Sequence, residues 1–312
     1  MTNYTYIQYI DDVINKKIPT GHLVKLAVQR HLNDLETGHR RGLYFDKKAA
    51  EDVIDFISSL NHYAGKLAGL KIKLEPWQQF ILAMLFGWKR SDGTRRFRTG
   101  YLSVARKNGK TTLSLAIALY LMLVDGVPKA ENYFVSSTKS ASAFYLSRAI
   151  YMVNRPKFVC KNHTITDTWT KSQLISIGAK TRPTSLDGIN PHGVVIDELY
   201  NHQSSRLWDV SRFAMGNNKQ ALLFATTTAG IYRNTFCRSI DDYISMILDG
   251  TVEDDSCFGI IYTLDDKDDD LYEANWIKSN PNLGVSIQKL HLRDMRKERE
   301  LFKVKHLNIW PD

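Results

Sequence analysis

The chain has 312 residues, and its 42 lysines and arginines outnumber its 33 aspartates and glutamates, giving a formal net charge of +9. Hydrophobic residues make up 43% of the sequence, which excludes a wholly disordered chain. No apolar run reaches the ~20 residues that span a bilayer, and the N-terminus has no leader pattern, so we expect a soluble protein without membrane contact. The three widely spaced cysteines fit neither a disulfide framework nor a zinc site.

Basic residues are concentrated in two stretches. Eight lie between positions 89 and 110, where Asp92 is the only acid, and a second basic stretch runs from Lys289 to Lys305. An acidic stretch at 253–273 lies between them. Clustered cations can bind a polyanion such as nucleic acid, and they can equally form an ordinary solvated surface. The charge pattern leaves both interpretations open.

Apolar periodicity predicts helices first and an alternating pattern later. Asp46 can cap a helix that continues to about residue 60, and Glu75-Pro76-Trp77 starts another that ends near Phe86. Strands are predicted at 100–104, 133–136, 174–177, 194–196, 222–225 and 258–262, with helices at 111–124 and 140–153. Strands that alternate with helices indicate an α/β fold with a mostly parallel central sheet.

The loop between the first of these strands and its helix has the composition of a phosphate-binding loop, or P-loop. Its residues are Arg106, Lys107, Asn108, Gly109, Lys110, Thr111 and Thr112. Backbone N–H groups of such a loop surround phosphates, and the following helix N-terminus favours negative charge. We expect Lys110 to reach the β- and γ-phosphates and Thr111 to ligate Mg²⁺. Because Val104 replaces the first glycine of the consensus, the motif does not decide the question by itself.

Two later strands end in residues that would complete such a site. Asp197 and Glu198 follow the apolar run at 193–196, at the sheet edge where ligands of parallel sheets bind. Asp197 would hold Mg²⁺, and Glu198 would activate the attacking water. The run at 222–225 is followed by three hydroxyl residues that could sense the γ-phosphate, namely Thr226, Thr227 and Thr228. Solvated acids and β-branched residues are common at strand ends, so the prediction rests on the combination.

In this order the three motifs resemble the large subunit of the tailed-phage terminase, the motor that packages DNA into procapsids. Pro76-Trp77-Gln78 is similar to the family's adenine-contacting element, in which Gln78 would recognise the adenine base. The segments 185–193, 280–284 and 306–310 resemble the approach to the second motif and the close of the ATPase module. The resemblance implies a P-loop NTPase fold, with a helical N-terminal region at 1–70, an ATPase core at 71–250 and a small C-terminal lid or linker subdomain at 251–312.

The resemblance also implies roles for arginines and for a further domain. Arg106 would touch the γ-phosphate within its own subunit. Arg148 is the candidate for a finger that acts on a neighbouring subunit, with Arg182 and Arg206 as rivals. A nuclease domain with metal-binding carboxylates follows the ATPase module in this family. We expect that domain to be absent here, and we assign no nuclease residue.

The sequence therefore predicts an ATP-hydrolysing, Mg²⁺-dependent subunit of a DNA-packaging motor. The implied partners are double-stranded DNA gripped by its backbone, the portal protein, a small terminase subunit and further copies in a pentameric ring, although the isolated chain could be a monomer. The implied location is the cytoplasm of an infected bacterium, docked on the procapsid. Two alternatives stay open, a superfamily-2-type nucleic-acid-dependent ATPase and a nucleotide-binding assembly module without turnover. A sequence-specific DNA-binding protein has no helix-turn-helix or zinc-finger pattern in its favour.

Overall fold

The computed structural model describes residues 4–136, 139–153, 158–178, 190–202 and 204–311. Its helices are α1 (Tyr6–Ile14), α2 (His22–Thr37), α3 (Lys47–Ser59), α4 (Pro76–Gly87), α5 (Lys110–Leu123), α6 (Lys139–Val153), α7 (Arg206–Ala214), α8 (Phe236–Leu248), α9 (Trp276–Ser279), α10 (Lys289–Met295) and α11 (Arg299–His306). Its strands are β1 (Leu43–Phe45), β2 (Trp88–Arg90), β3 (Thr99–Ser103), β4 (Glu131–Ser136), β5 (Phe158–Lys161), β6 (Thr164–Asp167), β7 (Gln173–Gly178), β8 (Pro191–Ile196), β9 (Leu222–Thr227) and β10 (Cys257–Ile261).

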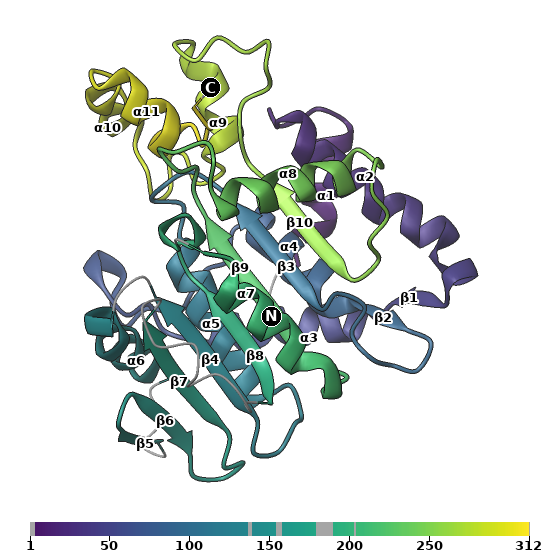
Figure 1. The fold of residues 1–312 in the computed structure, drawn as a ribbon. Coiled ribbons are helices and arrows are strands. Elements are labelled where there is room, and N and C mark those ends of the chain that lie inside the picture. Colours follow the sequence, from purple (N-terminus) through teal and green to yellow (C-terminus); the bar gives the residue numbers. More distant parts are fainter. Residues whose placement is uncertain (1–3, 137–138, 154–157, 179–189, 203, 312) are drawn as a thin grey trace.

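A twisted central sheet dominates the molecule (Figure 1). Its described strands lie in the order β10-β3-β9-β8-β4-β7-β6-β5. The strands from β10 to β7 are parallel, and β6 and β5 are antiparallel to them. Ser103 is in register with Thr227, and Ala225 is in register with Ile196. The carboxyl ends of β3, β9 and β8 therefore lie at one edge of the sheet, as the sequence predicts.

Helices cover both faces of this sheet. α4, α5 and α6 pack behind it in the view of Figure 1, and α7 and α8 lie in front. Every residue of α5 from Leu113 to Met122 is buried, because this helix lies between the sheet and α3. Gly193 lets β8 approach α5 closely, since a Cβ at this position would lie 2.7 Å from the Leu121 side chain. β8, which leads to Asp197, and α5, which begins at the end of the P-loop, are thus held in direct contact.

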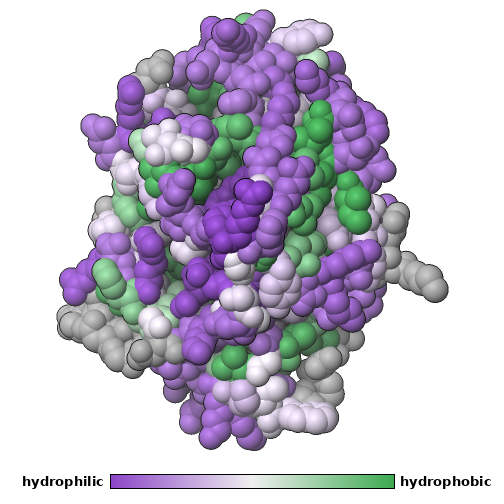
Figure 2. Space-filling view, turned by 90° about the vertical axis from the view of Figure 1, so that its right-hand side faces the viewer, coloured by the Kyte–Doolittle hydropathy of each residue, from purple (hydrophilic) through white to green (hydrophobic). Residues whose placement is uncertain are grey.

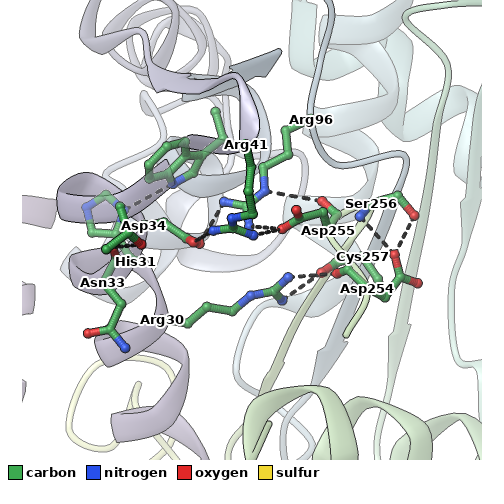
Figure 3. A network of polar contacts seen from close by, with 12 residues as sticks. Arg30, His31, Asn33, Asp34, Arg41, Arg96, Asp254, Asp255, Ser256 and Cys257 are labelled. Atoms are coloured by element: carbon green, nitrogen blue, oxygen red, sulfur yellow. Dashed lines mark hydrogen bonds and ion pairs between the residues drawn. The ribbon is translucent and has the colours of Figure 1, made fainter. Parts of the chain in front are cut away.

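The N-terminal helices are fastened to the core by a buried ion-pair network (Figure 3). Arg96, in the segment before β3, contacts Asp34 of α2 and Asp255 before β10 at 2.7 Å each. Arg41 contacts the same two carboxylates. Arg30 of α2 donates to two backbone carbonyls at the start of β10, at 2.7 and 2.8 Å. The network therefore holds α2 and the segment after it against the amino ends of β3 and β10.

The basic stretch at 89–110 is only partly at the surface, although surface placement underlies both interpretations of its charge. Arg95 and Arg96 are 1% and 0% exposed. Arg95 pairs with Asp125 at 2.7 Å, and Arg98 donates to the carbonyls of Ala221 and Met215. These guanidinium groups bridge distant segments of the core, so they are not available to a polyanion.

The surface on the side of the N-terminal helices is mostly hydrophilic, with hydrophobic groups separated by polar ones (Figure 2). Within the described residues no helix is long and apolar enough to cross a membrane.

The predicted elements agree with the structure. Asp46 caps α3 by accepting from the Ala49 N–H at 3.0 Å, and α4 begins at Pro76 as expected. The six predicted strands correspond to β3, β4, β7, β8, β9 and β10. The structure adds a hairpin, β5–β6, at the far edge of the sheet. β10 belongs to the region expected to form a separate lid or linker, yet it pairs with β3 in the central sheet.

Candidate active site

The P-loop contains two residues in the left-handed conformation and ends at the N-terminus of a helix. It runs from the end of β3 to the first residue of α5, with φ of +70° at Lys107 and +84° at Gly109. Gly109 precedes α5 directly, and a side chain there would be strained, since L-residues rarely adopt this region. Its left-handed turn leads into the helix N-terminus, which attracts anions.

Lys110 lies beneath this loop, with its ammonium turned into the site. Its Nζ donates to Thr228 Oγ1 at 2.6 Å and to the carbonyls of Val104 and Ala105 at 3.0 and 3.2 Å. Burial lowers the pKa of Lys110, and the nearby carboxylates of Glu198 and Asp197 act in the opposite direction. A buried ammonium among carbonyl oxygens is able to exchange these partners for phosphate oxygens, which carry more negative charge.

Asp197 joins the P-loop helix to the end of β9. Its Oδ2 accepts from Thr111 Oγ1 at 2.8 Å, and its Oδ1 accepts from Thr226 Oγ1 at 2.7 Å. Ser114 of α5 lies 3.3 Å from the same Thr226 hydroxyl. Burial raises the pKa of Asp197, as does the charge of Glu198, while the two hydroxyl donors oppose the shift. The predicted metal residues, Thr111 and Asp197, are therefore in direct contact.

Glu198 occupies a strained position immediately after β8. Its φ is +57°, a left-handed conformation that is uncommon outside glycine, asparagine and aspartate. The Oε2 atom is buried and has no hydrogen-bond partner among the described residues. A buried acceptor without a donor is costly in free energy, and such strain at a ligand site is often part of its function. The arrangement leaves one buried carboxylate oxygen without a donor from the described residues.

The turn after Glu198 connects Thr227 to Arg106 through Tyr200. The backbone N–H of Tyr200 donates to Thr227 Oγ1 at 3.1 Å. The Tyr200 hydroxyl accepts from the Arg106 guanidinium at 2.8 Å. The predicted coupling threonines thus have separate contacts, because Thr226 bonds to Asp197, Thr227 to the turn at 199–201, and Thr228 to Lys110.

The side chain of Asn108 forms hydrogen bonds with other residues of the protein. Its Nδ2 donates to Ala105 O at 3.1 Å and Asn280 Oδ1 at 3.0 Å, and its Oδ1 accepts from the Asn282 N–H at 3.0 Å. The carbonyl of Lys107 accepts from Ser286 Oγ at 2.6 Å. The segment 280–286 therefore braces the P-loop, which sequence reasoning did not assign to it.

Gln78 and Trp77 lie on the other side of the loop. Gln78 is buried, and its Oε1 accepts from the Glu75 N–H at 3.0 Å in a helix-capping contact. A Cβ on Gly109 would lie 3.3 Å from Gln78 Nε2, so this amide borders the P-loop. Trp77 is core and donates its indole N–H to Asn282 at 2.6 Å.

Arg148 of α6 packs against its own chain. Its guanidinium stacks on Phe144 and Tyr63, with centroid distances of 3.4 and 4.4 Å, and donates to the Tyr63 hydroxyl at 3.4 Å. Thr112 contacts the same hydroxyl, also at 3.4 Å. Of its rivals, Arg206 begins α7, and position 182 lies outside the described residues. The role of Arg148 on a neighbouring subunit stays a prediction.

The donor set fits a magnesium nucleotide. Mg²⁺ is held by hydroxyl and carboxylate oxygens together with substrate phosphates, and Thr111 and Asp197 provide such oxygens side by side. The P-loop supplies a left-handed turn and a helix N-terminus for phosphate, and the unpaired Glu198 oxygen would accept from water. Thr111 and Asp197 would hold the metal, and Lys110 would hold the phosphates.

Comparison with known proteins decides the family. The family model described as the ATPase domain of the terminase large subunit matches residues 76–246, more than half of the chain. The chain belongs to the terminase large subunit family. This confirms the resemblance and the P-loop NTPase fold expected from the sequence.

The comparison also overturns one expectation about the terminase chain. The family model of the terminase endonuclease domain matches residues 251–310. The expectation that the nuclease domain is absent is therefore wrong for this segment. The matched residues include β10 of the central sheet and continue into helices that contact the P-loop, so this segment packs as part of the same unit as the ATPase core.

Two curated proteins and one solved structure are similar to this terminase chain. Protein YmfN of Escherichia coli K12 is 37% identical over 131 residues, which are 40% of this chain and 29% of that protein. The terminase large subunit of Enterobacteria phage HK97 is 26% identical over 248 residues, 76% of this chain and 46% of that protein. The crystal structure of the HK97 large terminase superimposes with a TM-score of 0.69 at 20% identity, covering 84% of this chain and 55% of that one. The chain thus spans about half or less of the length of these relatives.

Several residues at the site were missed by sequence reasoning. Tyr200, Lys305 and Asn308 contact the predicted motifs, and Asn280 and Asn282 brace the P-loop. All five lie in or beside segments that carry the family resemblance. What the sequence does not reveal is which of their side chains point to the site.

Proposed function

We propose that this chain is the ATP-hydrolysing subunit of a motor that moves double-stranded DNA into a phage procapsid. The observation that carries the proposal is the joint placement of Lys110, Asp197 and Glu198 at the carboxyl edge of one sheet, within a family defined by its ATPase domain. The proposed cell location is the cytoplasm of an infected bacterium, on the procapsid. The proposed partners are the portal protein, a small terminase subunit and four further copies.

In the proposed mechanism, the P-loop N–H groups and Lys110 hold the phosphates of ATP. Mg²⁺, when bound, supplies positive charge to the phosphate oxygens. Glu198 orients a water molecule through its unpaired oxygen, which the strained backbone holds in place. Arg106 donates to oxygens on the γ-phosphate and compensates the charge that develops there.

Loss of the γ-phosphate would then be transmitted through the hydroxyls at the end of β9. Thr228 bonds to Lys110, Thr226 to Asp197 and Thr227 to the turn that follows Glu198. A change at any of these three groups therefore displaces the same strand end. Ala229, the next residue but one after β9, donates its N–H to Asn308 at 2.7 Å, which extends the path into the C-terminal segment.

Steady-state ATP hydrolysis tests this proposal, measured with and without linear duplex DNA at low and moderate salt. We expect turnover that DNA stimulates independently of its sequence, and stimulation that weakens steeply as salt rises, because phosphate-backbone contacts release counterions. Glu198→Gln should retain ATP binding and lose turnover, while Glu300→Gln on the exposed face of α11 should match the wild type. ATP binding with no turnover under any condition would favour the assembly module, and strand separation of a tailed duplex would favour a helicase.

A further inference from the structure

A cavity of about 890 Å³ opens on the Arg106 side of the P-loop. Its walls come from the P-loop, from the turn after β8, from the segment after β9, and from α10 and α11. Arg106 is the one predicted site residue that lines it. The opposite wall, formed by Phe302 and Lys305 among others, belongs to the segment that matches the endonuclease-domain model.

Lys305 contacts the P-loop and the residues that follow the other two motifs. Its backbone carbonyl accepts from the Arg106 N–H at 2.9 Å. Its Nζ donates to Ala229 O at 3.1 Å, directly after the coupling threonines. The same ammonium lies 4.0 Å from the centre of the Tyr200 ring, whose hydroxyl accepts from Arg106. Arg106 and Lys305 are therefore held against one tyrosine, at its edge and on its face.

Neither of these two cations forms an ion pair in the part of the chain that the structure describes. Among the described residues, no acidic side chain lies within 4.0 Å of either charged group, although Lys305 is only 9% exposed. Burial, together with the charges of Arg106 and Lys110, lowers the pKa of Lys305 to about 8, although the charge of Glu198 acts in the opposite direction. A buried lysine beside an arginine destabilises the empty site, and an anion bound between them would remove that cost.

We propose that Lys305 and Arg106 form a phosphoryl-binding pair, which receives the γ-phosphate of ATP or the phosphate released from it. This inference rests on the proposed function, since the anion is a product or a part of the proposed substrate. It makes α11, within the endonuclease-model segment, a wall of the ATPase site. The pair binds only the terminal phosphoryl group, whereas the P-loop and Lys110 also bind the phosphates that ADP retains.

Equilibrium binding of Mg²⁺-AMP-PNP, Mg²⁺-ADP and inorganic phosphate tests the pair without requiring turnover. Lys305→Met keeps the length of the side chain and removes its charge, and Lys305→Arg keeps the charge. Lys303→Met is the matched control, because Lys303 lies on the same helix and pairs with Asp270 at 3.3 Å. We expect Lys305→Met to bind AMP-PNP about 10- to 100-fold more weakly, as lost hydrogen bonds to charged groups generally do, with ADP affinity changed by less than about 3-fold. Lys305→Arg and Lys303→Met should bind both nucleotides as the wild type does.

The phosphate arm separates the two sources of the anion. If Lys305→Met loses AMP-PNP affinity, the pair holds the γ-phosphate; if it loses only phosphate affinity in the presence of ADP, the pair holds the released product. Equal losses for AMP-PNP and ADP, or no loss for any of the three, would overturn the inference. A wild type that binds AMP-PNP in this way but never hydrolyses ATP would refute the proposed function alone.

The pH dependence of AMP-PNP binding gives a second readout. Wild-type affinity should fall as alkaline pH removes the Lys305 proton, and the fall should be absent in Lys305→Arg. The charged and titratable groups that surround Lys305 are Arg106, Lys110, Glu198, Tyr200, Cys237 and His306. Lys305→Met should melt at or above the wild-type temperature without nucleotide, since it removes an unpaired buried charge. A parallel fall of affinity with pH in Lys305→Arg would assign the titration to another group and count against the pair.

Discussion

Arg96→Met isolates the contribution of the network that joins the N-terminal helices to the core. The Arg96 side chain is fully buried and contacts Asp34 and Asp255 at 2.7 Å each, and its guanidinium also stacks on Trp88 and Phe97. Asp34 is 7% exposed at its side chain, so removing Arg96 takes a counter-charge from a buried carboxylate. Although burial opposes it, the charge of Arg96 lowers the pKa of Asp255, which shows that the pair favours the ionised acid.

The expected loss of stability follows from these contacts. Removing one partner of a buried ion pair costs about 3–5 kcal/mol. Because Arg41 still contacts both carboxylates, we expect about 3 kcal/mol for Arg96→Met. At about 2 cal/mol/K of unfolding entropy per residue, that loss lowers Tm by about 4–5 °C in a chain of 312 residues.

Thermal unfolding of the two arginine variants, followed by circular dichroism, measures this. Arg41 is 42% exposed at its side chain, so Arg41→Met should cost about 1 kcal/mol or less. Nucleotide affinity should stay unchanged in both variants, since the network lies at the amino ends of β3 and β10 and the site at the opposite end of the sheet. Equal shifts in Tm for the two variants would refute the reasoning that burial decides the cost.

Three further predictions concern single residues. Asp241 accepts from Tyr101 and Trp310, and burial raises its pKa to about 6. Because the folded state then holds the proton more tightly than the unfolded state, the contribution of Asp241 to stability falls as the pH rises from about 4 to about 6. The Tm of Asp241→Asn relative to the wild type should therefore rise over that interval. Gly109→Ala places a Cβ at φ +84° and should cost about 1–2 kcal/mol of stability and most of the ATP affinity, measured by melting and by titration calorimetry. Thr111→Val removes a hydroxyl from Asp197 and should weaken Mg²⁺-dependent ATP binding at least about 10-fold, while Mg²⁺-free binding changes less.

The sequence predicts the central part of the fold because its signals are local. The parallel strands are continuous apolar runs that end in acids or hydroxyls, and Asp46 and Pro76 start helices by backbone chemistry that needs no tertiary partner. The β5–β6 hairpin was not predicted because its local signal is weak. Its turn places Asn162 and His163 at φ +49° and +61°, and histidine in place of glycine gives only a weak turn signal.

The candidate site was predictable only where its residues belong to the motifs. Lys110, Asp197 and Thr226 come together because parallel strands end at a common edge. Lys305 is 76 positions away from Ala229, the residue it contacts, and nothing local marks it apart from the other lysines of its helix. The role of the basic stretch at 89–110 could not be decided from the sequence for a related reason, since counting charges cannot distinguish a surface cation from a buried one that is paired over a long range.

Hydrolysis of bound ATP in a single turnover tests the central claim most directly, with protein in excess over nucleotide so that release steps do not enter. Wild type and Glu198→Gln would be mixed with Mg²⁺ and labelled ATP and quenched over time. The account predicts that both proteins bind the ATP and that only the wild type converts it to ADP, with a rate in Glu198→Gln lower by about 10²-fold or more. Conversion at the same rate in both proteins would contradict it, because Glu198 would then not be the residue that activates water.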